Sequence, residues 1–160
     1  MNDVLNKYID EIKDKIINST CEIINIPSVF DNTDSNTPFG IHTVEALNYM
    51  LNLGKSFGFR TKNIDNKCGY IEFGEGDKLL GIVAHLDVVP ADGGWNFSPF
   101  NSTIYNNNIY GRGAIDDKGP VMATLYAMKA VADNYTLNKR VRLILGLNEE
   151  NDWECIKRYK

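Results

Sequence analysis

Residues 79–84 of this chain read Leu-Leu-Gly-Ile-Val-Ala, a short apolar run rich in β-branched side chains. Such a run is typical of a strand that is buried on both faces of a sheet. A second run of this kind, Arg-Val-Arg-Leu-Ile-Leu-Gly-Leu, covers residues 140–147. Between them, residues 118–134 place apolar side chains at helical spacing: Val121, Leu125, Met128 and Val131. Strands that alternate with helices predict an α/β fold, with a mixed, mostly parallel sheet layered with helices.

The rest of the chain extends this pattern on both sides. We expect an N-terminal helix that ends near Ile24, because Pro27 follows it. A second helix is expected from about Ile41 to Phe57, where Gly58 suits a C-terminal stop. Short strands are expected near residues 60–64, 69–73, 103–105 and 109–110, and a last short helix near residue 152.

Composition narrows the classes of protein and partner. The chain has 160 residues, of which 43% are hydrophobic and 24% charged, as in one globular domain. A net charge of -4 without a basic patch argues against nucleic acid and anionic membranes as partners. No stretch approaches the roughly 18 apolar residues of a membrane span. Three widely spaced cysteines predict free thiols. With no secretory signal at the charged N-terminus, we expect a cytoplasmic protein.

The first polar group that carries chemistry is His85-Leu86-Asp87, directly after the apolar run 79–84. Strand periodicity places His85 and Asp87 on the same side. The Asp87 carboxylate can then accept a hydrogen bond from one ring nitrogen of His85 and leave the other nitrogen for a metal ion. Taken alone, the pattern also fits a histidine with a purely structural role.

Two acidic pairs follow further along the chain. Asp116-Asp117 stands after a Gly-flanked turn, where the helix beginning at Lys118 starts. These carboxylates can cap the helix, or one of them can bridge two cations. Glu149-Glu150 follows the apolar run 140–147. Because adjacent carboxylates repel, this pair is stable if it is solvated or if a cation neutralises one of the charges.

The three groups together are more specific than any one of them alone. His85, Asp116 and Glu150 each follow or flank a predicted strand on its loop side. Sites in open α/β sheets gather at the carboxyl ends of strands. One imidazole and two carboxylates suit zinc, with cobalt or manganese as substitutes. The sequence therefore predicts a metal site built from these three residues.

Four motifs of the chain resemble those of a known family. They are Val-Ala-His-Leu-Asp-Val-Val-Pro (83–90), Gly-Trp-Asn-Phe-Ser-Pro-Phe (94–100), Tyr-Gly-Arg-Gly-Ala-Ile-Asp-Asp-Lys-Gly-Pro (110–120) and the Glu149-Glu150 pair. The sequence is similar to the dinuclear-zinc aminoacylase, carboxypeptidase and dipeptidase superfamily, and within it to peptidase V-like bacterial dipeptidases. The resemblance implies a zinc exopeptidase-like fold, a small peptide as substrate, and a cis peptide bond between Asp116 and Asp117.

The same resemblance implies a role for each matching residue. His85 and Glu150 would each ligate one of two zinc ions, and Asp116 would bridge both ions. Asp87 would orient His85. Glu149 would be the general base that takes a proton from the metal-bridging water, which then attacks the peptide carbonyl. Aromatic residues such as Trp95, Phe97 and Phe100 would wall the pocket or belong to the core.

The resemblance also indicates what this sequence lacks. The family has a further carboxylate ligand, a late histidine ligand and a lid domain beyond the Glu-Glu pair, whereas this sequence ends at Lys160. We therefore expect residues 1–160 to be the N-terminal part of a catalytic domain, inactive alone, and completed by a missing C-terminal portion or by a homodimer. The other histidine, His42, is expected to be structural. Two alternatives stay open: an N-acyl amino acid deacylase of the same superfamily, and a catalytically dead binding module.

Overall fold

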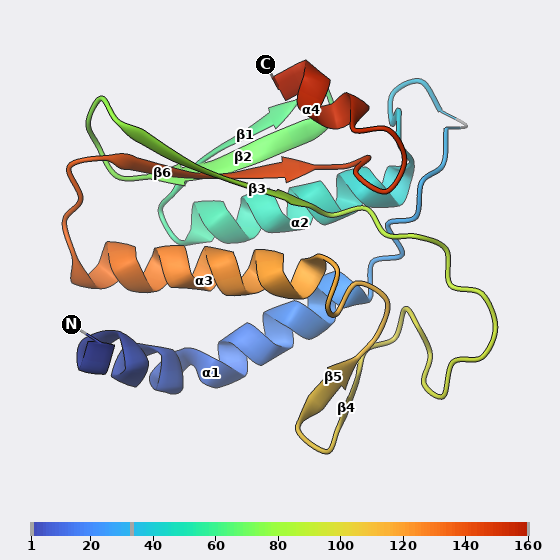
Figure 1. The fold of residues 1–160 in the computed structure, drawn as a ribbon, viewed down its shortest axis with the longest axis horizontal. Helices are drawn as coiled ribbons and strands as arrows, with labels where there is room; N and C mark the ends of the chain where they lie inside the picture. Colours follow the sequence, from blue (N-terminus) through green and yellow to red (C-terminus); the bar gives the residue numbers. More distant parts are fainter. Residues whose placement is uncertain (1, 33, 160) are drawn as a thin grey trace.

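The computed structural model describes residues 2–32 and 34–159, and it contains a mixed sheet with helices on both of its faces (Figure 1). Its elements are α1 (Asn2–Ile24), α2 (Ile41–Ser56), β1 (Arg60–Ile64), β2 (Cys68–Phe73), β3 (Leu79–His85), β4 (Thr103–Tyr105), β5 (Asn108–Tyr110), α3 (Lys118–Asn134), β6 (Arg140–Gly146) and α4 (Glu154–Tyr159). None of the described helices combines the length and the hydrophobicity that a membrane crossing requires.

The main sheet has the strand order β1-β2-β6-β3. β1 pairs antiparallel with β2, β2 pairs antiparallel with β6, and β3 pairs parallel with β6. The mixed α/β class is thus confirmed, but the expectation of a mostly parallel sheet is wrong for the described strands. For one of the two antiparallel pairs the reason is local: a tight turn at Asp65 and Asn66, both with positive φ, joins β1 to β2, and so short a turn makes strands antiparallel.

The helices are arranged in layers around this sheet. α2 and α3 cover one face, α1 packs against α3 on the side away from the sheet, and α4 lies against β2 on the opposite face (Figure 1). The core forms where α2 and α3 meet the sheet. Side chains with no exposed surface there include Leu47, Met50, Leu125, Ile71 and Leu143.

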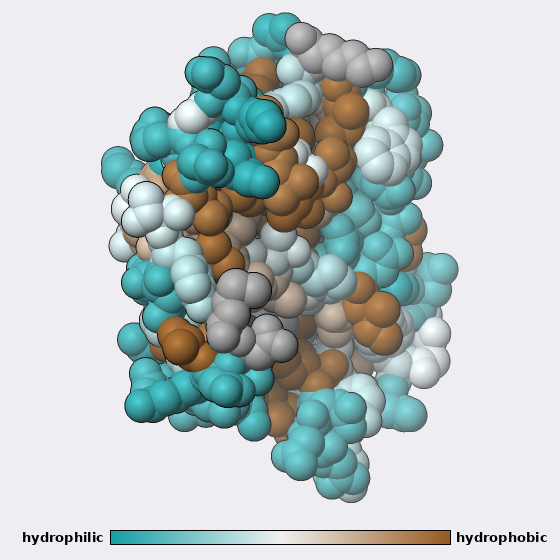
Figure 2. All heavy atoms as spheres, turned by 60° about the vertical axis from the view of Figure 1, so that its left-hand side comes forward, coloured by the Kyte–Doolittle hydropathy of each residue, from teal (hydrophilic) through white to brown (hydrophobic). Residues whose placement is uncertain are grey.

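The two apolar runs that predict the fold differ in burial. β6 lies inside the sheet, and Leu143 and Leu145 are fully buried. β3 was expected to be buried on both faces, and this expectation is wrong. Among the described strands only β6 pairs with β3, so β3 is an edge strand in which Leu80 and Val83 are 52% and 54% exposed. Figure 2 shows a face of the molecule on which hydrophobic side chains reach the surface in a band between hydrophilic margins.

Candidate metal centre

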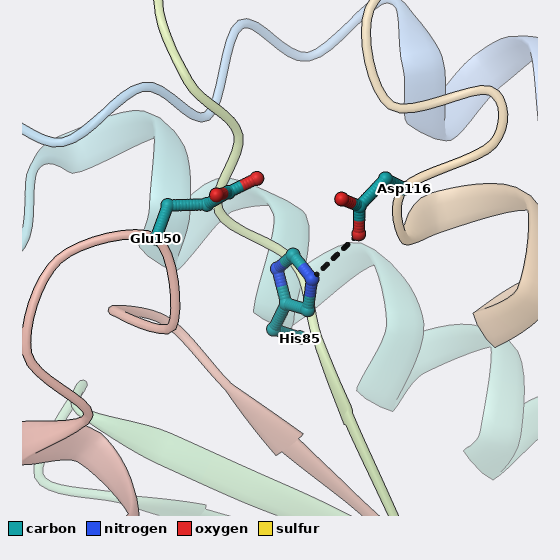
Figure 3. Close-up of side chains that lie close together, drawn as sticks. All are labelled: His85, Asp116 and Glu150. Atoms are coloured by element: carbon teal, nitrogen blue, oxygen red, sulfur yellow. Dashed lines mark hydrogen bonds and ion pairs between the residues drawn. The ribbon is translucent and has the colours of Figure 1, made fainter.

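His85, Asp116 and Glu150 lie together where β3 and β6 end (Figure 3). His85 is the last residue of β3, Asp116 lies in the loop before α3, and Glu150 lies in the loop after β6. One ligand atom of each residue lies within 4.8 Å of the ligand atoms of the other two. The expected meeting of these three side chains is confirmed, while their role as metal ligands stays a prediction.

The imidazole of His85 is contacted on both of its nitrogens. Nε2 lies 3.0 Å from Asp116 Oδ1 and 3.7 Å from Glu149 Oε2. Nδ1 lies 3.0 Å from the backbone carbonyl oxygen of Asp87 and 3.5 Å from its Oδ1. The nearer partner of Nδ1 is therefore the Asp87 carbonyl, whereas the sequence suggested the carboxylate. A proton on Nδ1, donated to this carbonyl, leaves Nε2 directed at the acidic cluster as a ligand for a cation.

The Asp87 carboxylate has a further role, which sequence reasoning missed, while its role in orienting His85 stays a prediction. It is 1% exposed and accepts the backbone N–H of Glu149 at Oδ1 and that of Glu150 at Oδ2, each at 3.0 Å. One buried anion thus fixes the main chain of both glutamates. No local signal could have revealed this contact, because the partners are 62 and 63 residues apart in sequence.

Asp117 is a second residue whose role was missed. It stands at the N-cap position of α3 but makes no side-chain capping hydrogen bond. Its Oδ2 instead accepts the backbone N–H of His85 at 3.2 Å, which ties the start of α3 to the end of β3. The peptide bond between Asp116 and Asp117 is cis, as the resemblance implied.

The charges in this cluster are unbalanced. Burial opposes the positive charge of His85, but the carboxylates of Asp87, Asp116 and Glu149 outweigh it and raise the pKa of His85 to about 9. Burial, followed by the charge of Asp116, raises the pKa of Glu150. A divalent cation would offset the repulsion between the Glu150 carboxylate and its acidic neighbours. The donor set of one imidazole and two carboxylates therefore fits a divalent metal ion.

A hollow of about 450 Å³ opens beside Asp116 and is lined by Trp95 and residues 108–116. The guanidinium of Arg112 lies 5.0 Å from the centre of the Trp95 ring. Of the aromatic residues considered for the pocket wall, Trp95 lines this hollow and Phe97 lines the adjoining one, whereas Phe100 lines neither. His42 lies on α2, where its Nδ1 is 2.9 Å from Glu45 Oε2, and it is not part of the cluster.

Comparison with known proteins places this site in a family. Residues 81–157, which span the whole cluster, match the model of peptidase family M20/M25/M40. This part of the chain is therefore similar to that family. The M20 match covers the His85, Asp116-Asp117 and Glu149-Glu150 motifs, so the family resemblance inferred from them is confirmed.

Individual relatives extend the similarity to most of the chain. The protein of Bacillus subtilis (strain 168) named "Putative dipeptidase YtjP" is 49% identical over 150 residues, which are 92% of this chain and 32% of the relative. Human carnosine dipeptidase 1 superposes with a TM-score of 0.79 at 25% identity, covering 94% of this chain and 35% of that one. An M20 family metallo-carboxypeptidase from Sulfolobus solfataricus superposes with a TM-score of 0.72 at 31% identity, covering 84% and 31%.

These likenesses confirm the zinc exopeptidase-like fold class. The chain spans about a third of the length of the curated relatives it matches. That residues 1–160 form the N-terminal part of a catalytic domain stays a prediction.

Proposed function

We propose that His85, Asp116 and Glu150 bind zinc in a metallopeptidase centre that hydrolyses dipeptides. The observation that carries this proposal is the meeting, within 4.8 Å, of ligand atoms from three distant segments of the sequence, all inside the stretch that matches the M20 family model. The names of the relatives favour a dipeptide over an N-acyl amino acid as substrate, since both the Bacillus protein and the human protein are named dipeptidases.

In the proposed hydrolysis, a metal ion and the residues of this chain have different tasks. A bound divalent ion supplies Lewis acidity, which polarises a peptide carbonyl and lowers the pKa of water. His85 Nε2 and the carboxylates of Asp116 and Glu150 would hold the cation. Glu149 has a side chain that is 27% exposed, with Oε2 3.7 Å from His85 Nε2. In this proposal Glu149 would accept a proton from the attacking water and pass it to the leaving amine.

A two-ion centre needs more ligands than this cluster offers. Among the described residues the cluster supplies one imidazole and two carboxylates. We therefore propose that further ligands come either from a C-terminal portion like that of the longer relatives or from a second copy of the chain. A cytoplasmic location, and cobalt or manganese as substitutes for zinc, belong to this proposal.

Zinc titration of purified variants tests the metal centre. We expect His85→Ala and Glu150→Gln each to weaken zinc binding by about 100-fold or more, since each removes a ligand. The matched controls His42→Ala and Glu11→Gln remove an exposed histidine and an exposed glutamate elsewhere, and they should bind zinc like the parent protein. Equal zinc affinity in all four variants would contradict the proposed centre. A parent protein that binds no zinc would favour the binding module.

A further inference from the structure

The segment that follows α1, residues 26–29, is bonded to the stretch that carries His85 and Asp87. Ser28 is fully buried, and its hydroxyl donates a hydrogen bond of 2.6 Å to the carbonyl of Leu86, the residue between them. The Val88 N–H donates to the Ser28 carbonyl at 3.0 Å, and Val29 forms a parallel bridge with Val88. Segment 26–29 therefore fixes the main chain around His85 and Asp87.

Lys118 joins the same segment to the loop that carries Asp116. It is the first residue of α3, is fully buried, and donates from Nζ to the carbonyl of Ile26 at 2.6 Å. Its stem packs where Gly113 leaves room: a Cβ added at Gly113 would lie 2.9 Å from Lys118 Cδ and 3.0 Å from Val88 Cγ1. Burying a lysine is costly unless its ammonium is bonded, so this contact specifies one geometry.

We propose that Ser28 and Lys118 are positioning residues of the metal centre. They act through segment 26–29 and fix the position of His85 relative to Asp116. The inference rests on the proposed metal centre. Both residues act through main-chain carbonyls: Ser28 on that of Leu86, and Lys118 on that of Ile26. Loss of the Ser28 hydroxyl removes a donor from the buried carbonyl of Leu86. Loss of the Lys118 ammonium leaves the carbonyl of Ile26 with only the N–H of Ser28 and unties α3 from segment 26–29. Groups that orient metal ligands typically change metal affinity by about 10–100-fold when they are removed.

Cobalt titration, followed by visible absorption, tests the role of Ser28. We expect Ser28→Ala to weaken Co²⁺ binding about tenfold and to change the absorption spectrum, because the ligand geometry changes. Ser19→Ala is the matched control. It also deletes a buried hydroxyl, which lies 2.9 Å from the hydroxyl of Tyr126 in the middle of α3. This control should lose stability and yet keep its Co²⁺ affinity and spectrum.

A metal-free measurement separates positioning from general stability. The chain has only two histidines, so in a His42→Gln background the imidazole ¹⁵N signals report His85 alone. Ser28→Ala should shift or broaden these signals, and Ser19→Ala should leave them in place.

Lys118→Met should weaken Co²⁺ binding by up to about 100-fold. If Lys118→Met does not fold, the two serine variants decide the question.

The double variant Ser28→Ala/Lys118→Met adds a further check. Its Co²⁺ affinity should be only a little lower than that of the more impaired single variant, because both side chains act through the same segment. The outcomes distinguish the metal centre itself from the positioning role of Ser28 and Lys118. A parent protein that binds no Co²⁺ would overturn the metal centre and this inference with it. A parent that binds Co²⁺, with Ser28→Ala indistinguishable from Ser19→Ala in affinity, spectrum and imidazole signals, would overturn the positioning role alone.

Discussion

The carboxylate of Asp87 accepts the backbone N–H of Glu150 at 3.0 Å. With its other oxygen the same carboxylate accepts the N–H of Glu149. Since Asp87 lies just after β3 and the glutamates just after β6, this one side chain locks together two loops at the end of a parallel strand pair. The local geometry of the acidic cluster therefore depends on a residue that is not among its three convergent ligand groups.

Asp87→Asn should damage both stability and metal binding. The amide has one acceptor oxygen, so one of the two N–H groups is left without its partner. We expect a loss of about 2 kcal/mol in the free energy of unfolding and zinc binding weaker by about 10–100-fold. Urea unfolding and zinc titration measure the two effects. Asp92→Asn, on an exposed loop, is the control and should change neither. Parent-like values for Asp87→Asn would refute this role.

Gly119→Ala should disturb the loop that carries Asp116. A Cβ at this position in the first turn of α3 would lie 2.1 Å from the backbone oxygen of Ala114, which a real atom cannot do. We expect a loss of about 3 kcal/mol in the free energy of unfolding, because either the helix start or the loop must move. Gly93→Ala, where an added Cβ meets nothing within 4 Å, serves as the control. Equal melting temperatures for the two variants would rule out this close approach.

The buried carboxylate of Glu72 should make stability depend on pH in the acid range. Burial raises its pKa, but hydrogen bonds from Arg142 and Arg60 outweigh burial and hold the pKa of Glu72 below its ordinary value. The folded protein therefore binds this proton less readily than the unfolded chain. The stabilisation is present above the ordinary value of 4.5 and is lost as pH falls through the lower folded pKa.

Glu72→Gln should flatten this acid dependence. At neutral pH we expect it to lower the free energy of unfolding by about 1–3 kcal/mol, because charge-assisted hydrogen bonds are lost. Urea unfolding at a series of pH values measures both effects. Glu75→Gln is a matched control, since Glu75 bonds the same Arg60 from an 84% exposed position, where ion pairs contribute little. An unchanged pH profile in Glu72→Gln would argue against the lowered pKa.

The 160-residue chain alone, supplied with zinc, should hydrolyse dipeptides slowly or not at all. The described cluster brings one imidazole and two carboxylates together, and a two-ion centre requires more protein ligands to set its geometry. Release of amino acids from unmodified dipeptides, with N-acetyl amino acids assayed in parallel, measures this. Rapid dipeptide hydrolysis that Glu149→Gln abolishes would contradict the expectation and would indicate that a second copy completes the site.

Local sequence patterns predicted most element boundaries. β1 and α3 begin and end at the residues expected from periodicity and turn signals. α4 begins at Glu154 and not at Asp152, because the Asp152 carboxylate accepts the Glu154 N–H and so precedes the helix. These features depend on neighbours in sequence, which is why the sequence alone was sufficient or nearly so.

Features that depend on distant neighbours were harder to predict. The composition of β3 is that of an interior strand, but burial is decided by which strands lie beside it. The meeting of His85, Asp116 and Glu150 could be predicted, because strand ends converge at one edge of a sheet. The contacts of Asp87 with residues 149 and 150, and of Lys118 with Ile26, could not, because no spacing rule links positions so far apart.

The free edge of β3 also has a consequence for how the protein behaves in solution. Edge strands usually carry charges, prolines or bulges that discourage other chains from adding to the sheet. From Leu79 to Ala84 this strand has neither a charge nor a proline. Its open backbone groups and exposed Leu80 and Val83 form a template for any extended apolar segment. Aggregation of the isolated chain should therefore start at this strand and increase with protein concentration. Val83→Lys, which places a charge on the exposed edge, should suppress it.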